Sequence, residues 1–327
     1  MKALSHAHDT LAAMPSLSLA QYPSPIEELA RLRAALDIAP RLLIKRDDAL
    51  SFGFGGNKVR KIEMVTARAL EDDADVLITT GGVQSNHCRV TAAAAARLGM
   101  RCVIVANGTP PDRATGNALL DQLFGAEVRY VASREERAPA MDAAARQLRA
   151  EGHHPVVIPL GASTPLGAIG FVRAVGELVS QVPQPPDYIF HSSSSGGTQA
   201  GLVAGCGLHG LRTRVVGISA DESTEGIQAT VTRIIHGIGE MLGVDGDSLM
   251  THPIEADDRF VGPGYGTPTE GSVEAQSLLA RTEALVVDHT YTAKALAGLI
   301  AWAREGRFRE TDTVLFWHTG GQVAVFA

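Results

Sequence analysis

The stretch Tyr188-Ile-Phe-His-Ser-Ser-Ser-Ser-Gly-Gly-Thr-Gln-Ala-Gly201 is the clearest indication of the fold. A short apolar run typical of a strand passes through a loop of small residues into a helix-like pattern. Small residues at such a junction let the backbone wrap around an anion, which the N–H groups and dipole of the helix start then bind. We interpret Ser195, Gly196, Gly197 and Thr198 as a phosphate-binding loop, with a flexible Ser/Gly turn as the alternative. The loop has neither a Walker A sequence nor the pattern GxGxxG.

The same order, a strand followed by a helix, recurs along the chain. Short apolar runs are predicted as strands at Leu42–Lys45, Val76–Thr79, Cys102–Val105, Val128–Val131, Val156–Ile158, Tyr188–Phe190, Val215–Ile218, Leu285–Val287 and Val314–Phe316. Helix-like segments lie near 58–72, 84–98, 115–124, 134–151, 166–181, 198–209, 226–242, 270–282 and 292–305. Most of the runs are continuously apolar, which is typical of strands covered on both faces. The pattern predicts an α/β fold with mostly parallel sheets.

The composition argues against several classes of function. The 327 residues carry a formal net charge of −7 and only 5% aromatic residues, so neither charge nor base stacking favours nucleic-acid binding. No apolar run approaches the roughly 20 residues that cross a bilayer, and the N-terminal MKALSHAHDT lacks the apolar stretch of an export signal. Cys88, Cys102 and Cys206 fit no metal-ligand spacing. We expect a cytoplasmic protein of about two domains, without a membrane segment or a metal.

Glycine-rich segments fall at the ends of predicted strands, where α/β proteins place their ligands. Besides Ser192–Gly201, these segments are Gly53–Lys61, Gly81–Arg89, Gly262–Gly271 and His318–Gln322. We expect them to form the ligand site.

Two of these segments place reactive or polar side chains at helix starts. Lys58 directly follows two glycines and an asparagine; buried beside a ligand, its amine could lose a proton and form a Schiff base with a carbonyl. By spacing alone, a basic first turn that points into solvent is the favoured alternative. Ser85, Asn86 and His87 lie where backbone N–H groups suit a substrate carboxylate. A simple helix N-cap is the alternative there.

Three further residues are candidates for contact with a ligand. Tyr265 and Tyr291 stand at segment edges and could donate a proton to a leaving group or bind a carboxylate, or be ordinary packed tyrosines. Thr319 follows the last predicted strand and could contact a ligand above the strand ends, or stabilise a turn. The pair Asp47-Asp48 follows two basic residues and is interpreted as a local ion cluster rather than a metal site.

A phosphate loop, a Schiff-base lysine and a carboxylate site on one α/β scaffold suggest a phosphorylated aldehyde cofactor, and pyridoxal 5′-phosphate fits. The chain resembles the D-cysteine desulfhydrase / 1-aminocyclopropane-1-carboxylate (ACC) deaminase family. The matching motifs, in order, are Lys45-Arg-Asp-Asp48, Gly55-Gly-Asn-Lys-Val-Arg-Lys-Ile-Glu63, Gln84-Ser-Asn-His87, Ser195-Gly-Gly-Thr-Gln-Ala-Gly201, Gly264-Tyr-Gly266, Tyr291-Thr-Ala-Lys294 and His318-Thr-Gly-Gly321.

This resemblance implies a fold-type II pyridoxal-phosphate enzyme, similar to the tryptophan synthase β-subunit. Such enzymes have two three-layer α/β/α domains with mostly parallel sheets and usually pair as homodimers. The large cofactor-binding domain is expected at residues 1–60 and 170–327, and a small inserted domain at residues 61–169.

The resemblance also implies roles for the candidate residues. Lys58 looks like the residue that links to the cofactor and moves protons. Ser85 matches the family's catalytic serine near the substrate carboxylate and Cα, Asn86 looks like a partner of the cofactor's ring hydroxyl and a substrate contact, and His87 like a carboxylate contact. Residues Ser195 to Thr198 resemble the phosphate loop. Tyr265 and Tyr291 look like the two active-site tyrosines, and Thr319 like the residue that faces the pyridine nitrogen.

Two departures from the ACC deaminases indicate the substrate. Those enzymes are similar to one another in having Glu after the second tyrosine and Gln after Ser-Asn, where this chain has Thr292 and His87. We expect β-elimination from a small amino acid, with D-cysteine giving pyruvate, sulfide and ammonia. ACC deaminase and L-cysteate sulfo-lyase activities are the alternatives within the same chemistry. A non-catalytic pyridoxal-phosphate-binding protein and a Rossmann-type nucleotide binder are the more distant ones.

Overall fold

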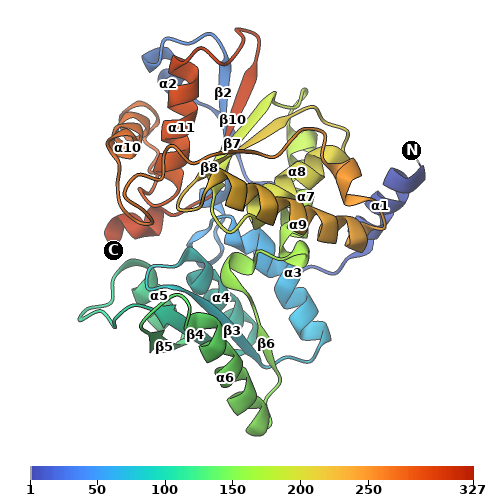
Figure 1. Ribbon diagram of the computed structural model, residues 1–327, viewed down its shortest axis with the longest axis vertical. Helices are drawn as coiled ribbons and strands as arrows, with labels where there is room; N and C mark the ends of the chain where they lie inside the picture. Colours follow the sequence, from blue (N-terminus) through green and yellow to red (C-terminus); the bar gives the residue numbers. More distant parts are fainter. Residues whose placement is uncertain (1) are drawn as a thin grey trace.

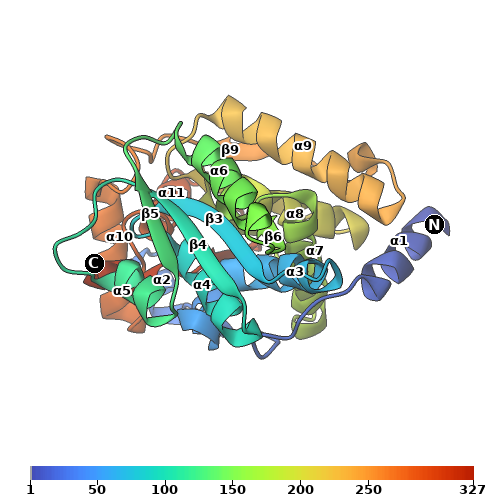
Figure 2. The same ribbon diagram turned by 90° about the horizontal axis from the view of Figure 1, so that it is seen from below.

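The computed structural model of the chain describes residues 2–327 and contains two β-sheets, which lie in the upper and lower halves of Figure 1. The larger sheet has the strand order β1 (Ile26–Glu28), β2 (Arg41–Arg46), β10 (Thr313–His318), β7 (Tyr188–Ser193), β8 (Arg214–Ser219) and β9 (Glu255–Asp257). The smaller sheet has the order β5 (Glu127–Val131), β4 (Arg101–Asn107), β3 (Val76–Gly82) and β6 (Pro155–Val157). Figure 2 shows the smaller sheet from below.

Neighbouring strands run parallel in both sheets, except that β1 is antiparallel to β2. The helices are α1 (Lys2–Ala13), α2 (Ala30–Ala35), α3 (Lys58–Glu71), α4 (Asn86–Leu98), α5 (Gly116–Leu123), α6 (Arg137–Ala150), α7 (Pro165–Gln181), α8 (Gly197–Leu208), α9 (Thr224–Leu242), α10 (Glu270–Glu283) and α11 (Thr292–Arg304). The α/β fold with mostly parallel sheets is confirmed. No helix within residues 2–327 combines the length and apolarity needed to cross a membrane.

Each sheet is covered by helices on both faces. In the larger sheet, Leu43 and Leu315 pack with α7, α8 and α9 on one face, whereas Leu42 and Phe316 pack with α10 and α11 on the other. In the smaller sheet, Leu77 and its neighbours pack with α4, and the opposite face packs on α6. Because both faces of every central strand are buried, the strands read as continuous apolar runs.

The predicted strand Leu285–Val287 is wrong. These residues form an irregular segment between α10 and α11. Val287 is fully buried in the core beside those helices, and its carbonyl accepts a hydrogen bond from the Gln276 side chain. Leu285 is partly buried against the same core and Val286 is exposed, so the apolar run is present here without strand pairing. The sequence also failed to reveal the three-residue edge strands β1 and β9, which are largely polar, and the helices α1 and α2.

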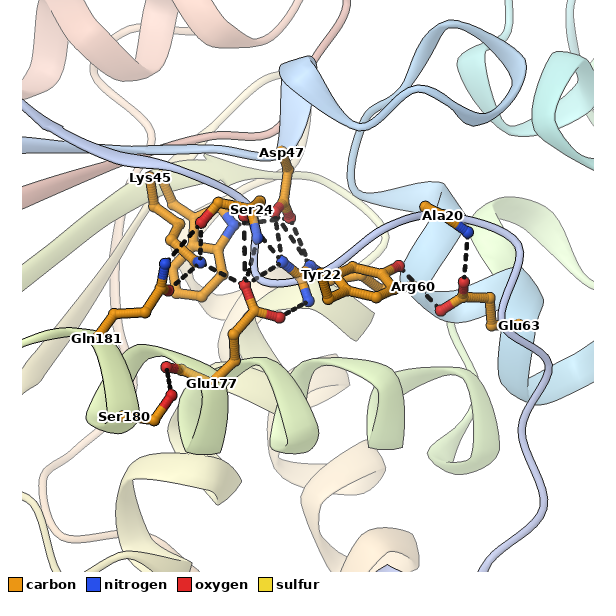
Figure 3. A network of polar contacts seen from close by, with 11 residues as sticks. Ala20, Tyr22, Ser24, Lys45, Asp47, Arg60, Glu63, Glu177, Ser180 and Gln181 are labelled. Carbon is orange, nitrogen blue, oxygen red and sulfur yellow. Dashed lines mark hydrogen bonds and ion pairs between the residues drawn. The ribbon is translucent and has the colours of Figure 1, made fainter.

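A buried polar network ties the start of α3 to the larger sheet and to α7 (Figure 3). Asp47, which is fully buried, accepts hydrogen bonds from the Arg60 guanidinium and from Trp317 Nε1. Arg60 also pairs with Glu177, which in turn pairs with Lys45. The two cations and two carboxylates balance one another, as buried charges require. The ion cluster predicted at Asp47-Asp48 is present, and it fixes the helix that begins with Lys58.

Candidate active site

A cavity of about 210 Å³ lies between the two sheets, and all five glycine-rich segments contribute to its lining. Lys58, Ser85, Ser195, Tyr265 and Thr319 each represent one of these segments. They meet because the carboxyl ends of the parallel strands in both sheets face the same space, as ligand sites in open α/β sheets do. The structure thus brings the candidate residues together around one cavity, with Gly197 lying between the lining residues Gly196 and Thr198.

Lys58 is the first residue of α3 and lies in this cavity, not in the open solvent that the alternative interpretation required. Its Nζ donates a hydrogen bond to Asn57 Oδ1 at 3.2 Å. Burial, followed by the nearby positive charge of Arg89, lowers the pKa of Lys58 to about 8. About a tenth of the amine is therefore neutral at pH 7, and a neutral amine is what a nucleophile or general base requires.

Ser85 and Asn86 open helix α4 at the edge of the cavity. Ser85 is the N-cap, and its Oγ accepts a hydrogen bond from Cys88 N at 3.3 Å. The capping interpretation is therefore correct, and it is compatible with a contact to a ligand. The Asn86 Oδ1 atom accepts from Arg89 Nη1 and Asn117 Nδ2. This fixes the amide plane and leaves Nδ2 as the donor on the other side.

His87 has a partner that the sequence did not reveal. The residue lines the cavity but is only 2% exposed, and its Nε2 lies 2.7 Å from Thr79 Oγ1 on β3. Burial and the charges of Lys58 and Lys61 hold the pKa of His87 well below its usual range. The imidazole is therefore neutral at physiological pH.

Tyr265 and Tyr291 also line the cavity, and their hydroxyl groups hydrogen-bond to each other. Burial raises the pKa of both phenols, so both stay protonated at neutral pH. Asp288, a fully buried residue that the sequence did not single out, accepts hydrogen bonds from the backbone N–H groups of Tyr291 and Thr292. It thereby sets the position of Tyr291 at the start of α11.

Thr319 joins two of the loops. Its Oγ1 lies 3.1 Å from Ser192 Oγ, and its carbonyl accepts a hydrogen bond from Asn57 N at 2.9 Å. A Cβ atom added to Gly320 would lie 2.7 Å from Gly56 Cα. The loop that carries Thr319 and the loop that leads to Lys58 are therefore in direct backbone contact.

Comparison with known proteins shows the family to which this chain belongs. The sequence model described as "Pyridoxal-phosphate dependent enzyme" matches residues 17–320. The chain belongs to this family. Pyridoxal phosphate is its cofactor, and the chain is an enzyme of the fold-type II group.

Individual proteins that are similar to this chain in sequence or structure are consistent with this family. A D-cysteine desulfhydrase of Klebsiella pneumoniae (strain 342) is 36% identical over 324 residues, which cover 97% of both chains. A D-cysteine desulfhydrase of Salmonella typhi is also 36% identical with the same coverage. A solved "ACC deaminase homologue" superposes with a TM-score of 0.91 at 35% identity, covering 98% of this chain and 96% of that chain. Tomato (Solanum lycopersicum) threonine deaminase isoform 2, with a TM-score of 0.70 at 16% identity, covering 98% of this chain and 84% of that chain, shares the fold.

The loop before α8 fits the phosphate group of pyridoxal phosphate. A Cβ added to Gly197, the first residue of α8, would lie 2.7 Å from Ser163 Oγ and 2.8 Å from Lys61 Nζ. Only glycine leaves the helix start open there, so its N–H groups can face an anion. Ser195 Oγ lies 2.7 Å from Ser163 Oγ on the same wall. The chemistry of this donor set suits a phosphate.

Lys61 is a residue of this pyridoxal-phosphate enzyme that sequence reasoning missed. It is 1% exposed and donates to Ser163 Oγ and the Gly161 carbonyl. Burial, together with the charge of Lys58, holds the pKa of Lys61 well below its usual range. Lys58 and Lys61 are three residues apart on α3 and so share one face of the helix. That spacing was the available indication.

Charged residues at the rim of the cavity were also missed. Arg137, the first residue of α6, and Arg134, three residues before it, line the cavity from the side of the smaller sheet. Arg134 lies 3.6 Å from Asp221 Oδ2 and 5.2 Å from the centre of the Tyr265 ring. Nothing in the local sequence distinguishes these arginines from ordinary exposed ones, because the contact depends on how the two sheets are placed.

Proposed function

We propose that this protein catalyses β-elimination from a small amino acid, and that D-cysteine, giving pyruvate, sulfide and ammonia, is its substrate. One observation is the main support for this proposed function. The Lys58 amine, with a pKa of about 8, shares a cavity with a capped helix start and a pair of tyrosine hydroxyls. Those groups serve as a base, a carboxylate site and proton donors. The D-cysteine desulfhydrases that are 36% identical over 97% of the chain support the choice of substrate.

The side chains divide the work as follows. When bound, pyridoxal phosphate withdraws electrons from the substrate and makes its α-proton removable. Lys58 takes the α-proton, because its amine is partly neutral and lies in the cavity. Ser85 and the N–H groups at the start of α4 bind the substrate carboxylate. His87, the second residue of this helix, is a further contact for that carboxylate. Tyr265 and Tyr291, which stay protonated, donate a proton to the departing group.

Three residue sets hold the cofactor. Ser195, Gly196, Gly197 and Thr198, with Lys61, bind its phosphate. Asn86 Nδ2 would donate to the ring hydroxyl, since the Oδ1 atom of the same amide already accepts hydrogen bonds from Arg89 and Asn117. Thr319, which lines the cavity, would offer the ring nitrogen a neutral hydroxyl. A hydroxyl makes the ring a weaker electron sink than a carboxylate does, which β-elimination tolerates because the leaving group departs directly.

We also propose a domain division and an assembly. The larger sheet uses strands from residues 26–46 and 188–318, and the smaller one uses residues 76–157. These ranges support a large domain at 1–60 and 170–327 with a small domain inserted at 61–169. We propose a cytoplasmic protein that forms a homodimer; light scattering on the purified protein will test the homodimer.

A substrate panel tests the proposed reaction. The purified protein is incubated with D-cysteine, L-cysteine, ACC, L-cysteate and β-chloro-D-alanine. We expect pyruvate from D-cysteine and β-chloro-D-alanine, with sulfide from D-cysteine. We expect no 2-oxobutyrate from ACC and no sulfite from L-cysteate. Either of those products would replace D-cysteine as the substrate, whereas absence of turnover with the whole panel would overturn β-elimination.

The substitution Lys61→Met tests the phosphate site. Loss of one charge-assisted hydrogen bond to phosphate should weaken pyridoxal-phosphate binding by about 10- to 100-fold. The apoprotein should be at least as stable as the unsubstituted one, because burial of the Lys61 amine is costly, as the lowering of its pKa shows. Absorbance titration of the apoprotein gives the affinity, and thermal unfolding gives the stability. Ser195→Ala is the matched control, with less than about a tenfold loss from one neutral hydroxyl. Unchanged affinity in Lys61→Met would remove Lys61 from the site.

A further inference from the structure

A second cavity, of about 300 Å³, lies beside β3, β4 and β5 of the smaller sheet. Most of its lining side chains are apolar, among them Val83, Ile104, Pro110 and Val128. It shares Gly82 with the active-site cavity but otherwise has a separate lining. A cavity of this size and character is typical of sites for small organic ligands.

One carboxylate, Asp121 on α5, contributes to this apolar wall. Asp121 is 4% exposed, and among the described residues its Oδ1 has no hydrogen-bond partner. Burial raises the pKa of Asp121 to about 8, although the charge of Arg89 opposes the shift. Buried carboxylates are normally paired with a donor or a cation. An unpartnered one beside a cavity indicates a ligand that supplies the partner.

The charged and titratable groups around Asp121 do not satisfy it. The Arg89 guanidinium donates to the Gly55 carbonyl, Asn86 Oδ1 and Asn117 Oδ1 instead. Cys88 on α4, Cys102 on β4 and Tyr130 on β5 also lie near it, and burial raises the pKa of each of these groups. They are neutral at physiological pH and supply no positive charge.

The lining selects one class of ligand. A metal ion needs several oxygen ligands, and within residues 2–327 no group of three His, Cys, Asp or Glu side chains could hold one. An amino acid would bring a carboxylate for which this wall has no cationic partner. We propose that the cavity binds a small organic ammonium ion, with Asp121 as its counter-ion and the apolar wall around its hydrocarbon part.

This arrangement predicts a definite pH dependence. The ligand stays cationic up to about pH 10, like other alkylammonium groups, whereas Asp121 must lose its proton before it can pair. With a pKa of about 8, the ionised fraction rises about ninefold from pH 6 to pH 7 and levels off above pH 9. The affinity should follow that fraction.

The test uses N,N-dimethylcyclohexylamine, because a tertiary amine cannot form a Schiff base with the cofactor. Its binding to the holoenzyme is measured by calorimetry in amine-free phosphate buffer from pH 6 to pH 9. We expect one site, about ninefold tighter at pH 7 than at pH 6, and at least tenfold weaker binding of cyclohexanol at pH 8. No binding at pH 8 to 9, a flat pH profile or equal affinity for cyclohexanol would each overturn the proposal.

A pair of variants identifies the carboxylate. Asp121→Asn keeps the shape of the side chain and should weaken binding of the amine at least tenfold at pH 8 and abolish the pH dependence. Asp112→Asn removes a charge from the exposed neighbouring loop and should leave both unchanged. If Asp121→Asn fails to fold, the pH profile and the cyclohexanol comparison on the unsubstituted holoenzyme still decide. Equal affinity in folded Asp121→Asn would overturn the proposal.

Discussion

Replacing Lys58 with alanine is expected to lower the rate of β-elimination by on the order of 10³-fold or more, because the change removes both the covalent anchor and the proton acceptor. The visible absorption of lysine-linked pyridoxal phosphate should be lost at the same time. Turnover is followed as pyruvate formed, and cofactor binding as the absorption spectrum of the dialysed protein.

Two comparisons sharpen this result. Arg68→Ala alters the exposed end of the same helix, 61% of the Arg68 side chain being exposed, and should leave rate and spectrum unchanged. Added methylamine should restore part of the rate of the Lys58→Ala protein, since it replaces the missing amine. Lys58→Ala protein with near-normal turnover would disprove the assignment of Lys58 and leave the fold untouched.

The second large effect concerns stability. Asp47→Ala should reduce the free energy of unfolding by about 3–5 kcal/mol, the usual cost of stranding a buried charge. The change leaves the 4% exposed Arg60 side chain without its main partner and takes the acceptor from Trp317 Nε1. Urea unfolding of the apoprotein measures the loss.

Glu274→Ala provides the matched control for this prediction. It breaks the Glu274–Arg304 pair, in which both side chains are about half exposed, and surface pairs contribute only about 0–1 kcal/mol. Asp47→Asn should fall between the two, since an amide oxygen can still accept from Trp317. If Asp47→Ala and Glu274→Ala prove equally stable, the network of Figure 3 does not hold α3 in place.

Much of this fold could be predicted from local sequence. The nine helices expected from periodicity correspond to α3 through α11, and eight of the nine expected strands are present. The exception, at residues 285–287, shows the limit of local sequence: only Val287 of this apolar run is fully buried, and a run becomes a strand only where a partner strand pairs with it. The short polar strands β1 and β9 were missed for the opposite reason, because they lie at the sheet edges.

Some residues of the site could likewise be predicted from local sequence, and others could not. Lys58, Ser85 and the loop before α8 could be found because glycine and helix starts mark them in the sequence. Lys61 could have been found from its spacing to Lys58. Asp288 acts on Tyr291 through backbone N–H groups, and Arg134 reaches Asp221 from the other sheet. No short-range pattern encodes contacts of that kind.

The backbone contact between Gly56 and Gly320 has a practical consequence for engineering. The loops that carry Lys58 and Thr319 pack so closely that neither Gly56 nor Gly320 has space for a side chain. Random substitution of these two glycines should therefore yield mostly inactive protein. Arg134, which is exposed, and Arg137, which is half-buried, also line the cavity. Neither residue takes part in this backbone contact. Libraries that seek a new substrate should therefore vary residues 134 and 137 and leave the glycine pairs intact.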